Sequence, residues 1–75
     1  MNRIIYLHEF KKDRYYVFIK NNFQKIYKCT AIAKMHNTVA LKDLVTHESI
    51  AIYQGYTLEY EIFEISKEEN PEYFL

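Results

Sequence analysis

The chain has 75 residues, the length of one small domain, and ten Lys and Arg balance ten Asp and Glu, so its formal net charge is zero. The single cysteine excludes an intrachain disulfide, and the single glycine excludes a Gly-rich phosphate loop. No apolar run is long enough for a membrane-spanning helix, and the N-terminus lacks the layout of a signal peptide. Composition therefore predicts a cytoplasmic protein.

Residue usage favours strands over helices. Val, Ile, Thr and the aromatic residues make up 29 of the 75 residues, and these types suit a pleated, half-buried surface. Ile, Lys, Asn, Tyr and Phe, whose codons are rich in A and T, are abundant. This usage indicates an AT-rich genome, such as that of a low-GC bacterium, its phage or plasmid, or a virus.

Two strands are predicted at the start of the chain. Residues 3–10 form the first, which is apolar on both faces at its start, and residues 14–20 form the second. The short polar break at 11–13 predicts a hairpin between them. Asn21 follows and ends the second strand, because Asn tolerates left-handed backbone. The side chains of the second strand alternate between two faces, one with Tyr15, Val17 and Ile19, the other with Tyr16 and Phe18.

The middle of the chain is ambiguous in two places. Residues 25–36 fit a strand better than a helix, because the helical interpretation leaves a poor apolar stripe. Asn37 then predicts a turn into a strand at 38–42. Residues 46–49 form either a turn, followed by a short strand at 50–53, or the start of a short helix.

The clearest strand pattern lies at 56–65, where apolar residues alternate with Thr and Glu. Such alternation is typical of a strand with one buried face, and here the other face is acidic. The alternation slips at Ile62 and Phe63, which indicates a bulge or a strand that leaves its sheet. We expect a single β-rich domain at 1–66 and an acidic, aromatic-ended C-terminal tail at 67–75, either packed on the core or mobile.

Five or six short strands with few helical residues predict a mainly β fold. The expected architecture is a small antiparallel barrel or bent sheet of the OB or SH3-like kind, with room for one short helix. The alternative is an α+β fold, in which a three- or four-stranded sheet carries one helix.

Charge is divided unevenly along the chain. Residues 1–42 carry nine Lys and Arg against two acids, whereas residues 43–75 carry one Lys against eight acids. Such asymmetry points to a charged partner, and lysines among stacking rings are typical of single-stranded nucleic-acid binding. If the acidic last strand lies beside the basic strands, cross-strand ion pairs cancel this field. The candidate nucleic-acid-binding residues are Lys11, Lys12, Arg14, Tyr15, Tyr16, Lys25 and Lys28.

A partner protein explains the same division of charge. A dipolar surface steers a complementary partner, and exposed aromatic side chains anchor such interfaces. We therefore expect a small non-catalytic binding module, an inhibitor or adaptor of a phage, mobile element or low-GC microbe; the alternative is a single-stranded DNA- or RNA-binding protein. An unpaired edge strand would also allow a homodimer. The candidate protein-binding residues are Glu59, Glu61, Glu64, Tyr73, Phe74 and Leu75.

Catalysis and metal binding have weak support. Cys29 and His36 resemble a nucleophile and base only in residue type, since no motif surrounds them, and a small buried residue is the simpler interpretation of the cysteine. The spacings of His8, His36, His47 and Glu48 match no known metal site. We expect no enzymatic activity, no metal site and no cofactor.

Overall fold

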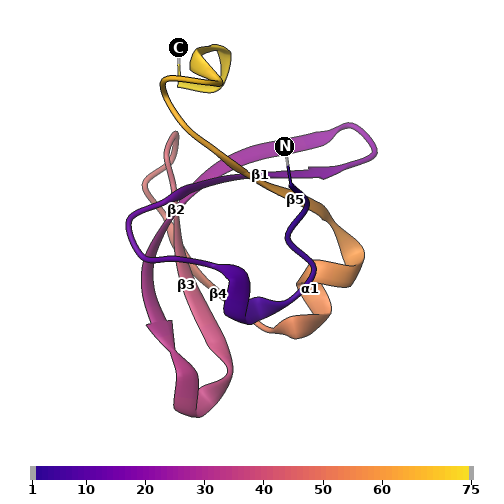
Figure 1. The fold of residues 1–75 in the computed structure, drawn as a ribbon, viewed down its shortest axis with the longest axis vertical. Helices are drawn as coiled ribbons and strands as arrows, with labels where there is room; N and C mark the ends of the chain where they lie inside the picture. Colours follow the sequence, from indigo (N-terminus) through magenta and orange to yellow (C-terminus); the bar gives the residue numbers. More distant parts are fainter. Residues whose placement is uncertain (1, 75) are drawn as a thin grey trace.

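Five antiparallel strands form one sheet in the computed structural model, which describes residues 2–74 (Figure 1). The strands are β1 (Tyr15–Lys20), β2 (Phe23–Ala33), β3 (Thr38–Asp43), β4 (Ser49–Ile52) and β5 (Glu61–Ile65). The helical elements of this part of the chain are the α-helix α1 (Gln54–Glu59) and the 3-10 helices η1 (Leu7–Glu9), η2 (Lys34–His36) and η3 (Pro71–Phe74). No helix within residues 2–74 is long and apolar enough to cross a bilayer.

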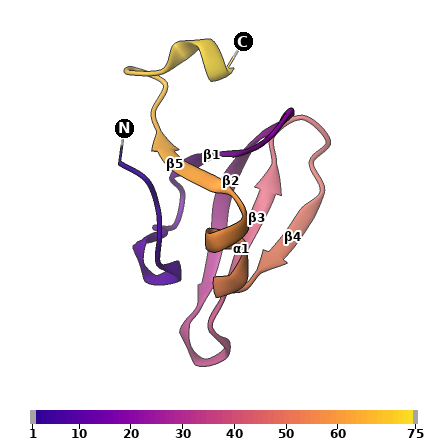
Figure 2. The same ribbon diagram turned by 90° about the vertical axis from the view of Figure 1, so that its right-hand side faces the viewer.

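The strand order is β4-β3-β2-β1-β5. The long strand β2 belongs to both halves of the sheet, because residues 23–28 pair with β1 and residues 27–33 pair with β3. A register shift between Cys29 and Ala31 bends β2, and the sheet folds over without closing into a barrel (Figure 2). The mainly β fold predicted from the sequence is confirmed in its bent-sheet form, with one short α-helix in the described residues.

The core fills the inner face of the bend. Tyr16 and Phe18 of β1 point into it, as the predicted alternation of this strand requires. The Phe18 ring is central, because its centroid lies 5.0 Å from that of Tyr27 and 5.9 Å from that of Tyr60. The other buried members of this cluster are Ile4, Phe10, Cys29, Val39, Leu41, Ile52 and Ile62.

The strand predicted at 3–10, with its hairpin to β1, is wrong. Arg3 makes one isolated bridge to Phe63, and the Ile4 N–H donates to the Ile62 carbonyl oxygen at 2.6 Å. Beyond these contacts the segment leaves the edge of β5. The chain then runs toward β1 without pairing with it.

A side chain turns this segment away from β5. The Glu9 carboxylate accepts hydrogen bonds from the N–H groups of Ile5 and Tyr6 at 2.9 and 2.8 Å, and the chain bends into η1. Local capture of backbone donors by a carboxylate competes with sheet pairing. Residues 2–14, which we call the N-terminal strap, therefore cross the open side of the bent sheet (Figure 1).

The strand predicted at 56–65 is wrong in its first half, where α1 forms, and only β5 is extended. The alternating tyrosines also suit a helix, because Tyr56 and Tyr60 lie four residues apart and stack with ring centroids 6.1 Å apart. Leu58, expected in the core, is 72% exposed. The chain must cross from β4 at one edge of the sheet to β5 at the other, and α1 lies in this crossing (Figure 2).

The predicted slip at Ile62 and Phe63 is not a bulge. The register between β1 and β5 runs from Tyr15 opposite Ile65 to Ile19 opposite Glu61 without a shift. Ile62 is buried on the inner face, and Phe63 is half-buried on the outer face. Ile62 and Phe63 are both apolar because β5 makes apolar contacts on both of its faces.

The turns agree better with the sequence. Asn21 and Asn37 adopt positive φ angles of 54° and 51°, as expected for Asn at these positions. β2 covers most of 25–36, as the favoured interpretation requires, and η2 covers the rest. Residues 46–49 lead through a turn into β4, so the alternative of a helix start is wrong.

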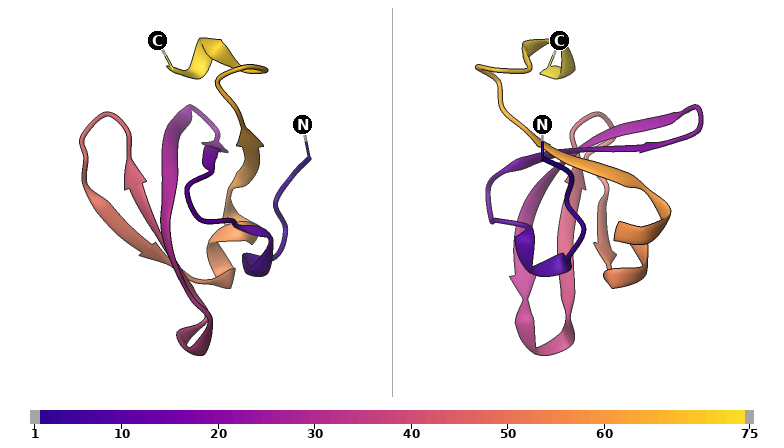
Figure 3. Two further views of the ribbon diagram at one scale, coloured as in Figure 1. Left: turned by 60° about the vertical axis from the view of Figure 1, so that its left-hand side comes forward. Right: turned by 45° about the vertical axis from the view of Figure 1, so that its right-hand side comes forward.

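The C-terminal tail packs on the outer side of β1 and not on the core. The rings of Phe74 and Tyr15 meet edge to face with centroids 5.0 Å apart. The Lys67 ammonium lies 5.6 and 5.8 Å from the centroids of the same two rings. Figure 3 shows the tail standing away from the open end of the sheet. Leu75 lies outside the described residues.

Candidate functional site

Two grooves lie on either side of the N-terminal strap, and both are lined by His8 and Lys11. The Gln54 side chain of α1 anchors the strap between them. Its oxygen accepts a hydrogen bond from the Leu7 N–H, and its amide donates to the Ile5 carbonyl oxygen, both at 2.9 Å. These two hydrogen bonds tie the strap, the wall that both grooves share, to α1.

The first groove, which we call the apolar groove, lies between the strap and the β2–β3 hairpin. Its volume is about 600 Å³, which is within the range of small ligand pockets. The apolar lining residues are Leu7, Phe10, Ile32, Ala33 and Val39. The polar lining residues are His8, Lys11, Lys12, Lys34, Asn37 and Thr38. The described lining of this groove therefore carries lysines and no carboxylate.

Three lysines make the rim of the apolar groove positive. Lys11 and Lys12 follow η1 in the strap, and Lys34 begins η2 at the end of β2. All three are exposed, and none makes an ion pair with another described residue. The left-handed backbone of Asn37 closes the hairpin and keeps Lys34 on the wall opposite the strap.

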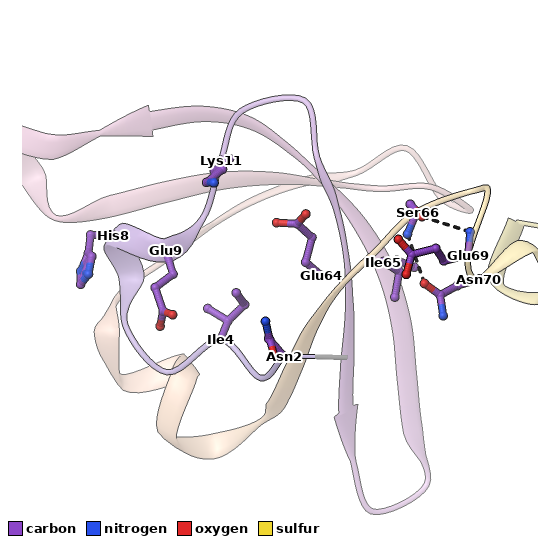
Figure 4. Close-up of a pocket in the computed structure, with 10 residues that line it drawn as sticks. All are labelled: Asn2, Ile4, His8, Glu9, Lys11, Glu64, Ile65, Ser66, Glu69 and Asn70. Carbon is purple, nitrogen blue, oxygen red and sulfur yellow. Dashed lines mark hydrogen bonds between the residues drawn. The ribbon is translucent and has the colours of Figure 1, made fainter.

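The second groove, which we call the polar groove, lies between the strap and β5 (Figure 4). Its volume is about 670 Å³. Figure 4 shows Glu9 and Lys11 on the strap, Glu64 on β5, and Ser66, Glu69 and Asn70 beyond it. Three carboxylates line this groove, so it differs in charge from the apolar groove on the other side of the strap.

The Tyr16 hydroxyl links the strap to β5 beside the polar groove. It accepts a hydrogen bond from the Lys11 N–H at 2.8 Å and donates to the Glu64 carboxylate at 3.4 Å. Burial raises the pKa of Tyr16 to about 12, and the charge of Glu64 acts in the same direction. The predicted stacking of Tyr16 on a base is therefore wrong, because this ring belongs to the core.

Glu9 also has a structural role in the polar groove. Hydrogen bonds from the N–H groups of Tyr6 and Ile5 lower the pKa of its carboxyl, because they stabilise the charged form. The Glu9 carboxylate in the polar groove therefore accepts hydrogen bonds from the strap backbone and holds the bend of the strap.

The other residues predicted to bind nucleic acid are scattered. Only Lys11 and Lys12 lie at a groove without an ion-pair partner among the described residues, and Tyr15 is covered by Phe74. Three predicted cations are paired with acids: Arg14 with Glu64 at 3.3 Å, Lys25 with Asp43 at 3.2 Å, and Lys28 with Asp13 at 4.0 Å.

The predicted acidic face does not exist as one surface. Glu59 ends α1, whereas Glu61 and Glu64 lie on opposite faces of β5. Because β5 pairs with β1, the acidic half of the sequence lies beside the basic half, and Arg14 and Glu64 neutralise each other there. Tyr73 and Phe74 of the predicted protein-binding set are half-buried in the tail, where the Phe74 ring packs on Tyr15 of β1.

The pair of Lys25 and Asp43 holds the end of β3 in place. Burial alone would raise the pKa of Asp43, but hydrogen bonds from the Val45 N–H at 2.8 Å, the Thr46 N–H at 3.2 Å and the Lys25 ammonium lower it overall. The hydrogen bond to Asp43 in turn raises the pKa of Lys25. Both side chains therefore stabilise the turn into β4.

Cys29 is a packing residue, as the simpler interpretation of the sequence has it. Its side chain is fully buried, and burial raises the pKa of its thiol, whereas His36 is exposed in η2. No group of three or more His, Cys, Asp or Glu side chains within residues 2–74 is placed to hold a metal ion.

Sequence reasoning missed the apolar groove. Its walls come from distant segments, since Phe10 lies in the strap, Lys34 in η2 and Val39 in β3. One local signal was present: Ile4, Leu7 and Phe10 recur every three residues, whereas a strand alternates every two. That spacing indicates a segment with one inward side that is not a strand.

Comparison with protein-family models finds none that matches the chain, and searches of curated proteins and of solved structures give no significant match.

Proposed function

We propose that this chain is a small non-catalytic protein-binding module, whose apolar groove holds an apolar side chain from an acidic segment of a partner protein. The observation that carries the proposal is the lining of that groove. Its floor is apolar, its rim has Lys11, Lys12 and Lys34, and the described residues place no carboxylate in it.

Each part of the lining selects one feature of the partner. Burial of one Leu or Phe side chain in an apolar site contributes roughly 1.5–3 kcal/mol. The three lysines attract carboxylates that flank this anchor, and they disfavour a basic partner. Lysine stems also cover apolar surface while their ammonium groups stay in water. An acidic segment with one large apolar residue fits these requirements together.

The anchoring of the strap supports the same proposal. Phe10 is only 2% exposed, and Gln54 holds the backbone on both sides of Tyr6. A groove with fixed walls loses little conformational entropy when a ligand enters, so modest contacts suffice for binding.

Single-stranded nucleic acid is the second candidate for the same lysines. The rings of Tyr6 and His8 stack with centroids 5.6 Å apart, and Tyr6 is 57% exposed, so a base has a ring to stack on. The protein partner is favoured because Tyr6 does not line the apolar groove, so a base stacked on its ring would leave the apolar lining of that groove unfilled.

Fluorescence anisotropy with two matched peptides tests the proposal. Both peptides carry a central Leu-Phe pair, flanked in one by glutamates and in the other by lysines. We expect the acidic peptide to bind and the basic peptide not to bind. The triple variant Lys11→Glu, Lys12→Glu, Lys34→Glu should weaken binding of the acidic peptide by at least about tenfold.

Lys42→Glu is the matched control, because Lys42 is exposed on β3 and does not line either groove. It should leave peptide affinity unchanged. A mixed-sequence single-stranded DNA is titrated in parallel. Binding of the DNA with a steep loss at higher salt, and no binding of either peptide, would replace the proposal by the nucleic-acid candidate.

A further inference from the structure

The two edges of the sheet differ in cover. At the β5 edge, the strap adds the bridge between Arg3 and Phe63 and the hydrogen bond from Ile4 to Ile62. At the β4 edge, no described residue pairs with the outer side of the strand. Figures 2 and 3 show β4 at the margin of the molecule with no segment beyond it.

Apart from its short length of four residues, the β4 edge lacks the usual features that prevent strands from pairing. Its sequence Ser-Ile-Ala-Ile contains no charge and no proline, and its register with β3 runs without a bulge. Ile50 is 37% exposed on this strand although it faces the same side as buried Leu41. Native edges of this kind are normally blocked by Lys, Pro or a bulge, or are covered by another segment.

We propose that the β4 edge pairs with the β4 edge of a second copy of this chain, antiparallel and about a twofold axis at Ala51. In this register Ile50 lies opposite Ile52 of the second copy, so the inner faces of the two sheets continue into each other. The ladder then ends with Ser49 opposite Tyr53 of the second copy, and no charged residues face each other across it.

A second copy fits this edge better than an arbitrary strand. The segment is neutral and nearly symmetric about Ala51, so the same residues satisfy both sides of an isologous contact. Shifting the register by two residues in either direction leaves one pair of isoleucines across the ladder, Ile50 with Ile50 or Ile52 with Ile52, in place of two, which loses apolar pairing. A twofold contact uses the same edge of both copies, so it gives a closed dimer and cannot extend into a polymer.

Sedimentation equilibrium with charge-swap variants tests the dimer. Ala51 is exposed on the outer face, so Ala51→Lys and Ala51→Glu each keep the monomer fold and place like charges opposite each other in the dimer. We expect the wild-type chain to show concentration-dependent dimerisation. Each variant alone should raise the dimer dissociation constant by about fivefold, and an equimolar mixture of the two should restore association.

Gln24→Lys is the control, since it adds a charge to an exposed position of β2 away from this edge. It should dimerise like the wild type. If a variant at Ala51 melts at a lower temperature, the double variant Ser49→Lys, Tyr53→Lys and its partner Ser49→Glu, Tyr53→Glu replace the pair, because Ser49 lies opposite Tyr53 of the second copy and both are exposed. A wild-type chain that stays monomeric at high concentration, or an Ala51→Lys variant that dimerises like the wild type, overturns the proposal.

This inference is independent of the apolar groove. The Lys11→Glu, Lys12→Glu, Lys34→Glu variant leaves β4 unchanged and should dimerise like the wild type. Failure of the dimer with intact peptide binding, or the reverse, therefore identifies which of the two proposals is wrong.

Discussion

The apolar groove and the polar groove share one wall, the N-terminal strap, and are similar in volume, yet they differ in the polarity and charge of their linings. One has an apolar floor and a rim of lysines, and the other has three carboxylates and the buried Tyr16 hydroxyl beside it. In the folded chain, three lysines line the apolar groove, and three carboxylates line the polar groove on the other side of the strap. Pairing of β5 with β1 brings acids of the second half of the sequence beside basic residues of the first half and neutralises some of both charges. The unpaired lysines of the groove rim remain.

The largest expected effect comes from the residue that holds the strap between the grooves. Phe10 is buried, and its ring centroid lies 4.6 Å from that of Tyr16. Phe10→Ala should lower the free energy of unfolding by about 3–5 kcal/mol, which is most of the stability of a domain this small. Urea denaturation measures this, with Tyr6→Ala as an exposed aromatic control. Equal midpoints for the two variants would contradict a strap anchored in the core.

The next largest effect is expected from the Tyr16 hydroxyl beside the polar groove. Tyr16→Phe removes the hydroxyl that joins Lys11 to Glu64, and it should cost about 1–2 kcal/mol of unfolding free energy at neutral pH. The folded pKa, about 12, lies above the ordinary 10.0, so the neutral phenol contributes stability that is present below pH 10 and lost as the pH rises toward 12.

Chemical denaturation between neutral pH and pH 12 separates these two effects. The Tyr16→Phe variant should lose less stability over the alkaline range than the wild type, because it has no phenol at position 16 whose ionisation would destabilise the fold. An alkaline profile identical to that of the wild type would show that the hydroxyl is not held in the bridge.

A smaller effect is expected at the tail, which borders the polar groove. Phe74→Ala removes the edge-to-face contact with Tyr15 and should lower stability by about 1 kcal/mol. Thermal denaturation measures it, and binding at the apolar groove should be unchanged. If stability is unaffected, the tail does not pack on β1 in solution.

The smallest effect concerns the neutralised charges. Arg14→Gln removes the ion pair with Glu64, in which both side chains are substantially exposed. Exposed pairs contribute little, so the change in stability should be below about 0.5 kcal/mol. A larger loss in urea denaturation would mean that the β1–β5 pairing depends on this ion pair and not on apolar contacts.

Local signals in the sequence predicted the parts of the fold that depend on local physics. β1 follows from its alternation, and the turns at Asn21 and Asn37 follow from the tolerance of Asn for positive φ. The strap was not predicted, because the carboxylate of Glu9 and the distant Gln54 decide its path. α1 was missed because the four-residue spacing of Tyr56 and Tyr60 fits the alternation of a strand as well as one turn of a helix.

The candidate site was less predictable than the fold. Lys11 and Lys12 were selected from the sequence, but Lys34 and Val39 join them only when the β2–β3 hairpin closes against the strap. Tyr16 was selected as an exposed ring and is a core residue, because alternation assigns a residue to a face without saying which face is covered. The neutralisation of surface charges by ion pairs, such as that of Arg14 with Glu64, likewise could not be predicted without the order of the strands in the sheet.

The most direct measurement is a nuclear magnetic resonance titration of the isotope-labelled chain with the acidic Leu-Phe peptide. The account predicts shifts confined to the apolar groove, at Leu7, Phe10 and Val39, and to the backbone of Lys34, with the resonances of Glu64 and Ser66 in the polar groove unchanged. Shifts at Glu64 and Ser66 in place of those at Phe10 and Val39, or no shifts at high peptide concentration, would contradict it.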